Sequence, residues 1–379
     1  MELVVAYLHD RALRRERRYR DPLDPINISD ENLIRYYRFP RCEILRLCEE
    51  LDPFLRRRTR RSHAVPIHTQ VLVALRFYAS GTFQHVLGDT VGLTQASVSR
   101  IIRDVTQILT ERARSEIKMP TGNVQIARTV QGFARIRNLP RVIGAIDGTH
   151  IPIKAPIENE GTYVNRKRYH SLNVQVVCNA DGLITNYSTK YPGCKHDAFI
   201  WANCLLRRRF EAGDFGDNYL IGDSGYPLEA FLMTPFRNPS TPGEVRYNNS
   251  HTKTRVVVEQ TFGVLKSRFR CLHRSGGSLQ YDPSKCAKIV NACFLLHNYC
   301  LMRRVPLPHD IVDDDGEIDN PAEAVAGTGQ AVRANVVPSL EEDLHLFGQK
   351  RFVASCHFCW YLALEVNPFH QWNHQLQLT

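Results

Sequence analysis

The sequence predicts an α/β domain preceded by an all-helical domain, and two patterns support this. Between positions 30 and 118, apolar residues recur at spacings of three and four, which is the period of an amphipathic helix. From position 141 onward, short apolar runs alternate with turn residues such as Asp-Gly and Pro-Gly, which is typical of strands. These runs follow the order three strands, a helix, a fourth strand and further helices. We therefore expect the second part of the chain to form one α/β domain.

The composition favours a globular protein with a polyanionic partner. The chain has 379 residues, enough for two or three domains, and 43% of them are hydrophobic, which excludes a wholly disordered chain. The net charge of +10 divides into +18 on positions 1–304 and −8 on the rest, which favours nucleic acid as the partner. The sequence has no run of 18 apolar residues, so no membrane span is expected. Eleven cysteines without a secretory signal predict free thiols in a reducing compartment.

Changes in composition divide the chain into six segments. Arginines crowd the arm 1–29 and recur at 56–61; either patch suits a nuclear-import signal or phosphate contacts, or equally a solvated face. An acidic run at 310–319 is expected to be a solvated linker. The expected segments are a basic arm (1–29), a helical domain (30–118), a connector (119–140), an α/β domain (141–304), a segment with the acidic linker (305–340) and an atypical tail (341–379).

The helical domain contains a pattern typical of a helix-turn-helix. Ser29 or Asp30 is placed to cap its first helix, and further on a short helix is expected to end at Gly92 before Thr94 caps the next one. The outer face of that last helix would present residue types that meet base edges and phosphates, namely Gln95, Ser97, Ser99, Arg100 and Arg103. An ordinary helix pair in a bundle has the same pattern, so both interpretations stay open.

The α/β domain is expected to contain four strands, at 141–154, 172–178, 183–191 and 219–223. A helix is predicted over 197–210 and another over 254–272, after an irregular stretch rich in Pro and Asn. The last predicted helix, 285–302, is very apolar. Its three cysteines, Cys286, Cys293 and Cys300, are spaced by seven and are expected to share one buried face.

Four acidic residues of this domain lie at positions that suit a catalytic or metal-binding site, namely Asp147, Asp197, Asp223 and Glu259. Three of them lie where a strand ends or a helix begins, and Glu259 interrupts an apolar segment. Converging carboxylates need positive charge, and Mg²⁺ or Mn²⁺ suits oxygen ligands. Taken one at a time, each is better explained as an unrelated surface, turn or capping residue.

Four segments in this order resemble the PIF/Harbinger transposase superfamily, which is of the DDE type. They are GAIDGTHI (144–151), YPGCKHDA (191–198), LIGDSGYP (220–227) and VEQTFGVLKSRF (258–269). The resemblance covers about residues 30–340 and is nearest to the Harbinger transposase-derived nucleases of vertebrates. It implies a ribonuclease-H-like mixed sheet with flanking helices over 141–304, preceded by a helix-turn-helix and followed by a closing helix at 329–337.

The same resemblance implies that the four carboxylates bind Mg²⁺ or Mn²⁺. Asp147, Asp223 and Glu259 are the preferred direct ligands, and Asp197 is either a ligand or a neighbour of the ligands. Beyond Glu259, three cations are expected to hold backbone phosphates, namely Lys266, Arg268 and Arg270. His150 and His196 are candidate proton or phosphate partners, and a structural role suits them equally.

The expected function is that of a metal-dependent DNA endonuclease derived from a transposase, cleaving phosphodiester bonds with metal-activated water and without transposition. The alternative is a catalytically silent DNA-binding or partner-binding protein that keeps the fold. The resemblance implies a separate Myb/SANT-like companion protein and a location in the nucleus and cytoplasm, and self-association stays open. In the tail, Cys356, Cys359, His370 and His374 resemble a zinc finger, but the ten-residue spacing between the pairs is too short, so no zinc site is expected.

Overall fold

The computed structural model describes residues 26–56 and 64–308, together with positions 330, 333 and 336. The basic arm, most of the second arginine patch, the acidic run and the zinc-finger-like pattern of the tail lie outside the described residues. Of the closing helix expected at 329–337, the three described positions are helical. None of the described helices is long and apolar enough to cross a membrane. Every cysteine that the structure describes is a free thiol.

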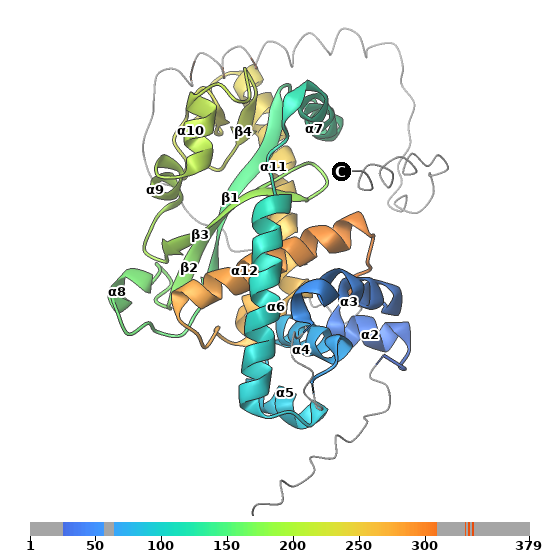
Figure 1. The fold of residues 1–379 in the computed structure, drawn as a ribbon. Helices are drawn as coiled ribbons and strands as arrows, with labels where there is room; N and C mark the ends of the chain where they lie inside the picture. The colour runs from blue at the N-terminus through green and yellow to red at the C-terminus, as the bar shows by residue number, and fades with distance from the viewer. Residues whose placement is uncertain (1–25, 57–63, 309–329, 331–332, 334–335, 337–379) are drawn as a thin grey trace, which may run out of the picture. The chain divides into compact units, whose positions relative to one another are not determined.

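A five-stranded mixed sheet forms the centre of the α/β part (Figure 1). Its strands are β1 (Val142–Pro152), β2 (Ser171–Cys178), β3 (Ile184–Pro192), β4 (Tyr219–Ile221) and β5 (Leu232–Met233), in the order β3-β2-β1-β4-β5. The first three strands are antiparallel neighbours, whereas β4 pairs parallel to β1 and β5 parallel to β4. A short turn joins β2 to β3, but the connection from β1 to β2 is longer and contains the short helix α8 (Glu160–Tyr163). The expected mixed α/β architecture is confirmed, and the two-residue β5 is a strand that the sequence pattern did not reveal.

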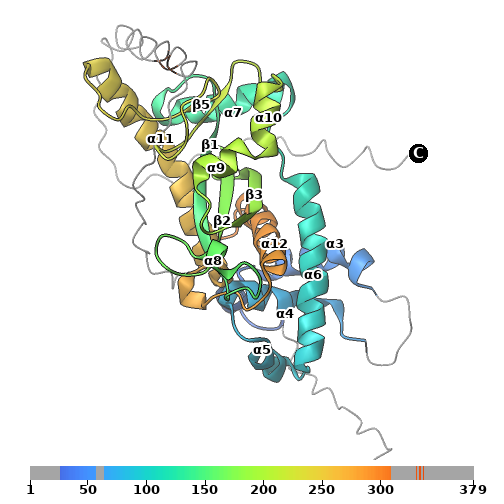
Figure 2. The same ribbon diagram turned by 90° about the vertical axis from the view of Figure 1, so that its left-hand side faces the viewer.

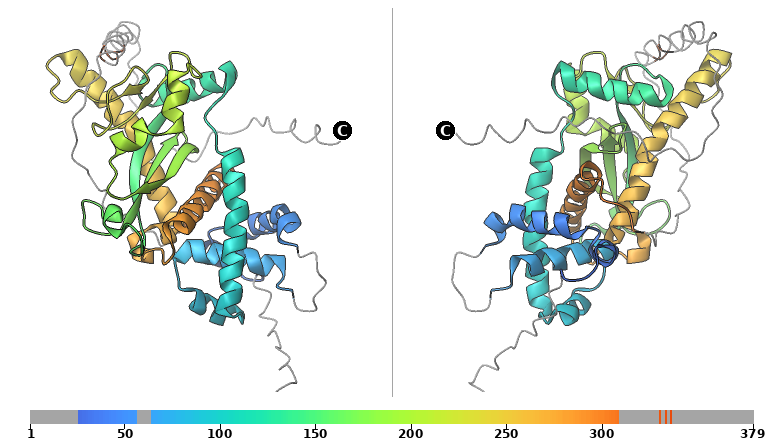
Figure 3. Two further views of the ribbon diagram at one scale, coloured as in Figure 1. Left: turned by 60° about the vertical axis from the view of Figure 1, so that its left-hand side comes forward. Right: turned by 90° about the vertical axis from the view of Figure 1, so that its right-hand side faces the viewer.

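Helices cover both faces of this sheet (Figures 2 and 3). One apolar cluster joins the sheet to α11 (Pro242–Arg268) and α12 (Pro283–Met302) and continues into the helical domain. A second cluster joins Ile143, Ile146 and Leu220 to Trp201 and Phe210, which belong to α9 (Asp197–Ala202) and α10 (Leu205–Glu211). The central strand β1 is therefore enclosed on both sides. A polar group on it is held away from most of the solvent.

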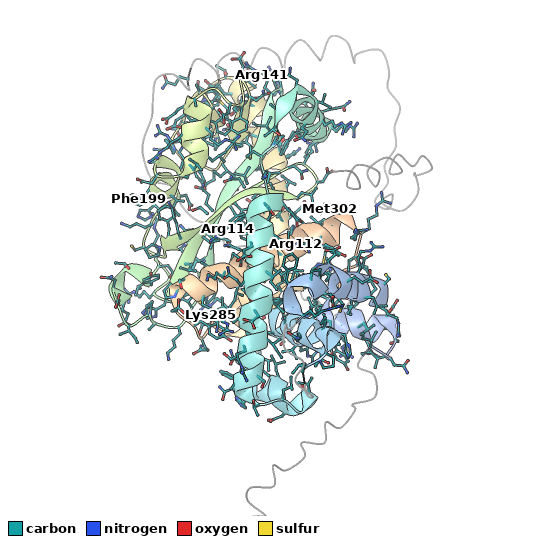
Figure 4. The ribbon with its side chains drawn as sticks, viewed as in Figure 1. Arg112, Arg114, Arg141, Phe199, Lys285 and Met302 are labelled. Atoms are coloured by element: carbon teal, nitrogen blue, oxygen red, sulfur yellow. The ribbon has the colours of Figure 1, made fainter. Side chains whose placement is uncertain are left out.

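The helical domain packs against the α/β part through α12. It consists of α2 (Asp30–Tyr37), α3 (Arg41–Leu55), α4 (Ile67–Ser80), α5 (Gln84–Val91) and α6 (Gln95–Glu116). The Thr110 hydroxyl of α6 donates to the Lys288 carbonyl of α12 at 3.0 Å. Figure 4 shows Arg112 and Arg114 on α6, where it crosses α12. The two domains predicted from the sequence therefore share one apolar core.

Local capping explains where several helices begin and end. Ser29 accepts from the Asn32 amide at the start of α2, and Thr94 accepts from the Ser97 amide at the start of α6. Gly92, with φ of 66°, ends α5 in the left-handed conformation that glycine adopts without strain. The helix boundaries expected at Gly92 and Thr94 are therefore confirmed. Whether this pair reads DNA as a helix-turn-helix stays a prediction.

Three helices differ from the expectation. The segment 119–140, expected as a connector, contains α7 (Gly122–Arg137). The helix expected over 197–210 is two helices, because the chain breaks after Ala202 and the Cys204 thiol accepts from the Arg207 amide to start α10. Helix α11 begins at Pro242 rather than at 254, because Thr241 and Glu244 form a capping box. The buried cysteine face expected on the last helix is confirmed, since its three cysteines are at most 1% exposed.

Candidate functional site

Asp147 is the most enclosed of the four predicted carboxylates. It lies on β1, where its register partner on β2 is Val176, and 16% of its side chain is exposed. Its Oδ1 accepts from the Gly148 amide at 2.8 Å. Burial raises the pKa of Asp147 to about 8 against the opposing effect of the nearby Arg255 guanidinium, and the negative charges of Asp223 and Asp197 raise it further. A carboxyl with this pKa holds its proton at neutral pH unless a cation approaches.

Asp197 and Asp223 reach the same neighbourhood from two different elements. Asp197 opens α9, and its Oδ1 accepts from the Asn173 amide group of β2 at 3.1 Å. It lies so close to β1 that a Cβ on Gly148 would stand 2.2 Å from Oδ1, so a larger residue there would displace the Asp197 carboxylate. Asp223 follows β4, and its Oδ1 accepts from the Gly225 amide at 3.0 Å. The structure therefore brings three of the four carboxylates together, and we call them the acid cluster.

Tyr226 closes the acid cluster from within the protein. It is 3% exposed, and its phenol oxygen has no hydrogen-bond partner among the described residues. Burial raises the pKa of Tyr226 well above its ordinary value, and the charges of Asp197, Asp147 and Asp223 add to this effect. A buried hydroxyl among three carboxylates remains a neutral group that can donate a hydrogen bond into the cluster.

Glu259 is connected to the acid cluster through an arginine. Arg255 and Glu259 lie one turn apart on α11, and the Arg255 guanidinium donates to Glu259 through one nitrogen. Its other terminal nitrogen donates to Asp147 Oδ2 at 3.0 Å. Arg255 is 20% exposed and Glu259 is 47% exposed, so Glu259 stands at the solvent edge of the site. A single positive charge thus bridges two of the predicted metal ligands.

The residues fit a divalent cation in charge and donor type. Within the described ranges, no group of three or more His, Cys, Asp or Glu side chains is placed so that it could hold a metal ion. Asp147 is buried near the negative charges of Asp223 and Asp197, and carboxylate oxygens are the ligands that Mg²⁺ and Mn²⁺ prefer. The Arg255 guanidinium supplies one such charge between Asp147 and Glu259.

The two predicted histidines flank the acid cluster, and each contacts a side chain outside it. His150 Nδ1 lies 3.0 Å from the Ser171 hydroxyl. His196, the residue before Asp197, has its Nδ1 3.0 Å from a terminal nitrogen of Arg166. On the outward side of the same helix, Phe199 projects at the edge of the protein (Figure 4), and 43% of it is exposed. Both histidines are therefore close in sequence to a predicted ligand, and a proton or phosphate role for them stays a prediction.

The residues predicted to meet DNA occupy two regions. On α6, Gln95, Arg100 and Arg103 are exposed, and Ser97 and Ser99 are half-buried. At the end of α11, Lys266 and Arg270 are half-buried, but Arg268 is 2% exposed. Its guanidinium donates to the carbonyls of Val305 at 2.8 Å and Pro306 at 3.1 Å, so it binds the protein's own backbone. The phosphate contact expected of Arg268 is not supported by its position.

The sequence patterns did not indicate Arg255 or Tyr226 as part of the site. Tyr226 stands within the LIGDSGYP segment, so its proximity to Asp223 in sequence was a signal. Arg255 had a weaker one, because a basic residue four positions before a glutamate on a helix is usually a surface ion pair. Its contact with Asp147, 108 positions earlier, appears only when α11 is packed on β1.

Comparison with known proteins places these residues in one family region. Residues 146–298 match the family model described as DDE superfamily endonuclease, and this range includes all four carboxylates. The chain is 44% identical to human "Putative nuclease HARBI1" over 275 residues, covering 73% of this chain and 79% of that protein. It is 39% identical to the protein of the same name from Xenopus laevis over 290 residues, which covers 76% and 82% of the two chains.

A more distant relative is "Protein ALP1-like" of Arabidopsis thaliana, at 27% identity over 248 residues, which is 61% of this chain and 60% of that protein. No solved structure gave a significant match. The identity to the vertebrate proteins extends over about three quarters of the chain, well beyond the acid cluster itself. The chain therefore belongs to the Harbinger-derived nuclease family of the HARBI1 proteins and carries a DDE superfamily endonuclease domain.

Proposed function

We propose that this protein is a divalent-metal-dependent DNA endonuclease with a ribonuclease-H-like catalytic domain, acting without transposition. The observation that supports this most is the convergence of three aspartates from β1, α9 and the end of β4 around one enclosed point of the sheet. The enclosure and mutual repulsion of these groups oppose folding, so their placement favours a role in binding cations. The same proposal places the protein in the nucleus and cytoplasm with a Myb/SANT-like companion, and it leaves self-association open.

In this proposal Asp147, Asp223 and Glu259 hold Mg²⁺ or Mn²⁺, and Asp197 supports them from α9. When bound, such a cation supplies Lewis acidity that activates water and stabilises the leaving oxygen of a phosphodiester. Asp147 must first lose the proton that its raised pKa retains at neutral pH. Glu259 stands at the solvent edge, and it would have to exchange its ion pair with Arg255 for the cation. Tyr226 is buried beside the cluster, where its hydroxyl is available to donate a hydrogen bond and its ring keeps solvent from that side.

The residues expected to hold DNA fall outside the acid cluster. We propose that Gln95, Ser99, Arg100 and Arg103 of α6 meet one segment of duplex, and that Lys266 and Arg270 contact the backbone near the end of α11. Arg268 is omitted from this set, because burial lowers the pKa of its guanidinium and backbone carbonyls occupy its donors. The proposal for α6 is supported by the exposure of Gln95, Arg100 and Arg103.

Nicking of supercoiled plasmid with Mg²⁺ or Mn²⁺ tests the activity. Glu259→Gln and Asp147→Asn are expected to lower the nicking rate at least a hundredfold, because each removes a negative ligand without changing the shape of the side chain. Glu211→Gln is the matched control, since Glu211 is an ion-paired carboxylate on the surface of α10. If the wild-type protein and Glu259→Gln nick plasmid at the same rate, the carboxylates do not catalyse and the proposal fails.

One observation favours a second function, that of a catalytically silent binding protein. Arg255 already donates to both Asp147 and Glu259, as a structural network would. In that case Mn²⁺ raises the melting temperature little or not at all, and DNA binds without being cut. Thermal melting with Mn²⁺ beside the nicking assay separates the two functions, because only the nuclease requires both responses.

A further inference from the structure

Residues 165–170, which precede β2, form a basic loop with three consecutive exposed cations, Arg166, Lys167 and Arg168. The loop is shaped by the buried Asn165, which is 5% exposed. The Asn165 side-chain oxygen accepts from the amides of Lys167 at 2.9 Å and Tyr169 at 3.3 Å. Its backbone amide donates to the Tyr169 carbonyl and its carbonyl accepts from the Arg168 amide. The cations are therefore presented by a fixed backbone rather than by a loose segment.

This basic loop contacts the two elements that carry Asp147 and Asp197. Arg166 lies 3.0 Å from the Nδ1 of His196, and the next residue is Asp197. The Asn165 amide group donates to the Ser171 hydroxyl at 3.1 Å, and that hydroxyl lies 3.0 Å from His150 of β1. One side chain thus separates Arg166 from the helix that opens with Asp197.

Further cations border the basic loop on both sides. The exposed Arg274 has its guanidinium 4.7 Å from the ring centroid of Tyr169, which is the far end of the loop. On the other side, the Lys195 ammonium lies 4.4 Å from the ring centroid of Phe199 on α9. Positive charge therefore extends from the loop along the margin of the acid cluster.

The cations of the basic loop can offset the negative charge of the acid cluster toward a polyanion. Three carboxylates and Glu259 repel a polyanion such as DNA, so an acid cluster cannot hold its substrate alone. Cations fixed beside it supply the attraction, and they do so through the backbone phosphates whatever the base sequence. We propose that the basic loop binds backbone phosphates of DNA next to the acid cluster, with Arg166 and Lys167 as the contacting residues. This inference rests on the proposed nuclease function only for the identity of the ligand as DNA.

Salt-dependent binding of a labelled DNA duplex tests the loop. The full chain is titrated into a labelled 30-bp duplex, followed by fluorescence anisotropy, in EDTA so that no strand is cut. Each lost phosphate contact is expected to reduce the slope of log K against log salt by about 0.9. The double variant Arg166→Ala with Lys167→Ala should therefore lose about 1.8 from that slope and bind roughly 60-fold more weakly at 0.1 M salt.

Two control variants separate the loop from general charge. Arg135→Ala with Arg137→Ala removes the same charge from two exposed residues of α7 and should change the slope much less. Arg166→Lys with Lys167→Arg keeps both charges and should retain the slope. An unchanged slope in the alanine variant overturns the proposal, and so does an equal loss in the α7 control. Because binding is measured without metal, a wild-type protein that binds DNA but never nicks plasmid rejects the nuclease and leaves the loop standing.

Discussion

Replacing Arg255 by methionine should tighten divalent-metal binding and destabilise the metal-free protein mainly at high pH. Methionine keeps a long unbranched side chain and removes the charge that bridges Asp147 and Glu259. Below pH 8 Asp147 largely keeps its proton, so the lost contact is a hydrogen bond to a neutral carboxyl. The expected cost to unfolding free energy is about 1–2 kcal/mol at pH 6.5. At pH 9 the wild-type carboxyl is ionised, and leaving it unpaired costs about 3–5 kcal/mol.

The effect on metal binding follows from comparing two costs. A divalent cation about 5 Å from a guanidinium would meet a repulsion of about 7 kcal/mol at an effective dielectric constant of about 20. Arg255 is 20% exposed and can instead turn outward, losing two hydrogen bonds that are worth about 2–3 kcal/mol together. The wild-type protein takes the route of smaller cost, in which Arg255 turns outward when the metal binds. Arg255→Met does not bear this cost of about 2–3 kcal/mol, so it should bind Mn²⁺ roughly 30- to 150-fold more tightly.

Isothermal titration with Mn²⁺, and melting with and without metal at pH 6.5 and 9, measure both effects. Arg207→Met is the matched control, because Arg207 also bridges two carboxylates, at 3.2 Å to Glu229 and 3.1 Å to Glu211, but lies outside the acid cluster. It should lower stability without changing Mn²⁺ affinity. Equal or weaker Mn²⁺ binding by Arg255→Met would refute the reasoning, since it would mean that Arg255 assembles the site rather than competing for it.

Three further predictions concern a glycine beside the acid cluster and two buried basic residues outside it. Gly148→Ala places a methyl 2.2 Å from Asp197 Oδ1, so it should lower the free energy of unfolding by about 1–3 kcal/mol and weaken Mn²⁺ binding. Gly263→Ala on α11, where nothing lies within 4 Å of the added methyl, is the control and should be neutral or stabilising. Denaturant titrations of both variants measure the difference. Arg268→Met should lower the melting temperature by several degrees, because three backbone carbonyls lose their donor. It should leave the salt slope of DNA binding unchanged, and a reduced slope would mean that Arg268 does contact a phosphate. Burial lowers the pKa of His297 to about 4, so this imidazole stays neutral in the folded protein, whereas in the unfolded chain it takes up a proton below about pH 6.5. The free energy of unfolding should therefore fall as the pH drops from about 6.5 to about 4. Urea titrations across that range should show a smaller fall for His297→Gln.

Much of the fold followed from periodicity alone. The apolar runs that begin at Arg141 and Leu172 correspond to β1 and β2 within one or two residues, and the capping residue Thr94 marks the start of α6. Such features are local, because each depends on a few neighbouring residues. Helix α7 was missed although Ile126, Val130 and Phe133 follow a helical spacing, because arginines and a glycine dilute the pattern.

The acidic residues of the site could be predicted from the sequence, but the ion pairs that they form could not. The resemblance identified four carboxylates, and the chain folds so that three of them interact. That Glu259 reaches the cluster through Arg255 depends on how α11 packs against β1, which no spacing along the chain specifies. Arg268 shows the same limit in reverse. Its position beyond Glu259 suits a phosphate contact, yet the turn of helix that follows directs its guanidinium to Val305 and Pro306.

The acid cluster opposes folding, and the size of that opposition bears on its purpose. A pKa of about 8 for Asp147, against an ordinary value of 3.8, means that ionising this carboxyl costs the folded state on the order of 5 kcal/mol. The folded protein keeps a proton that the unfolded chain releases, so metal-free stability should fall as pH rises from about 4 to about 8. Asparagine would occupy the same space without that cost. A carboxylate at this position therefore contributes nothing to metal-free stability at neutral pH that an amide would not, and its advantage appears only when a cation enters the cluster.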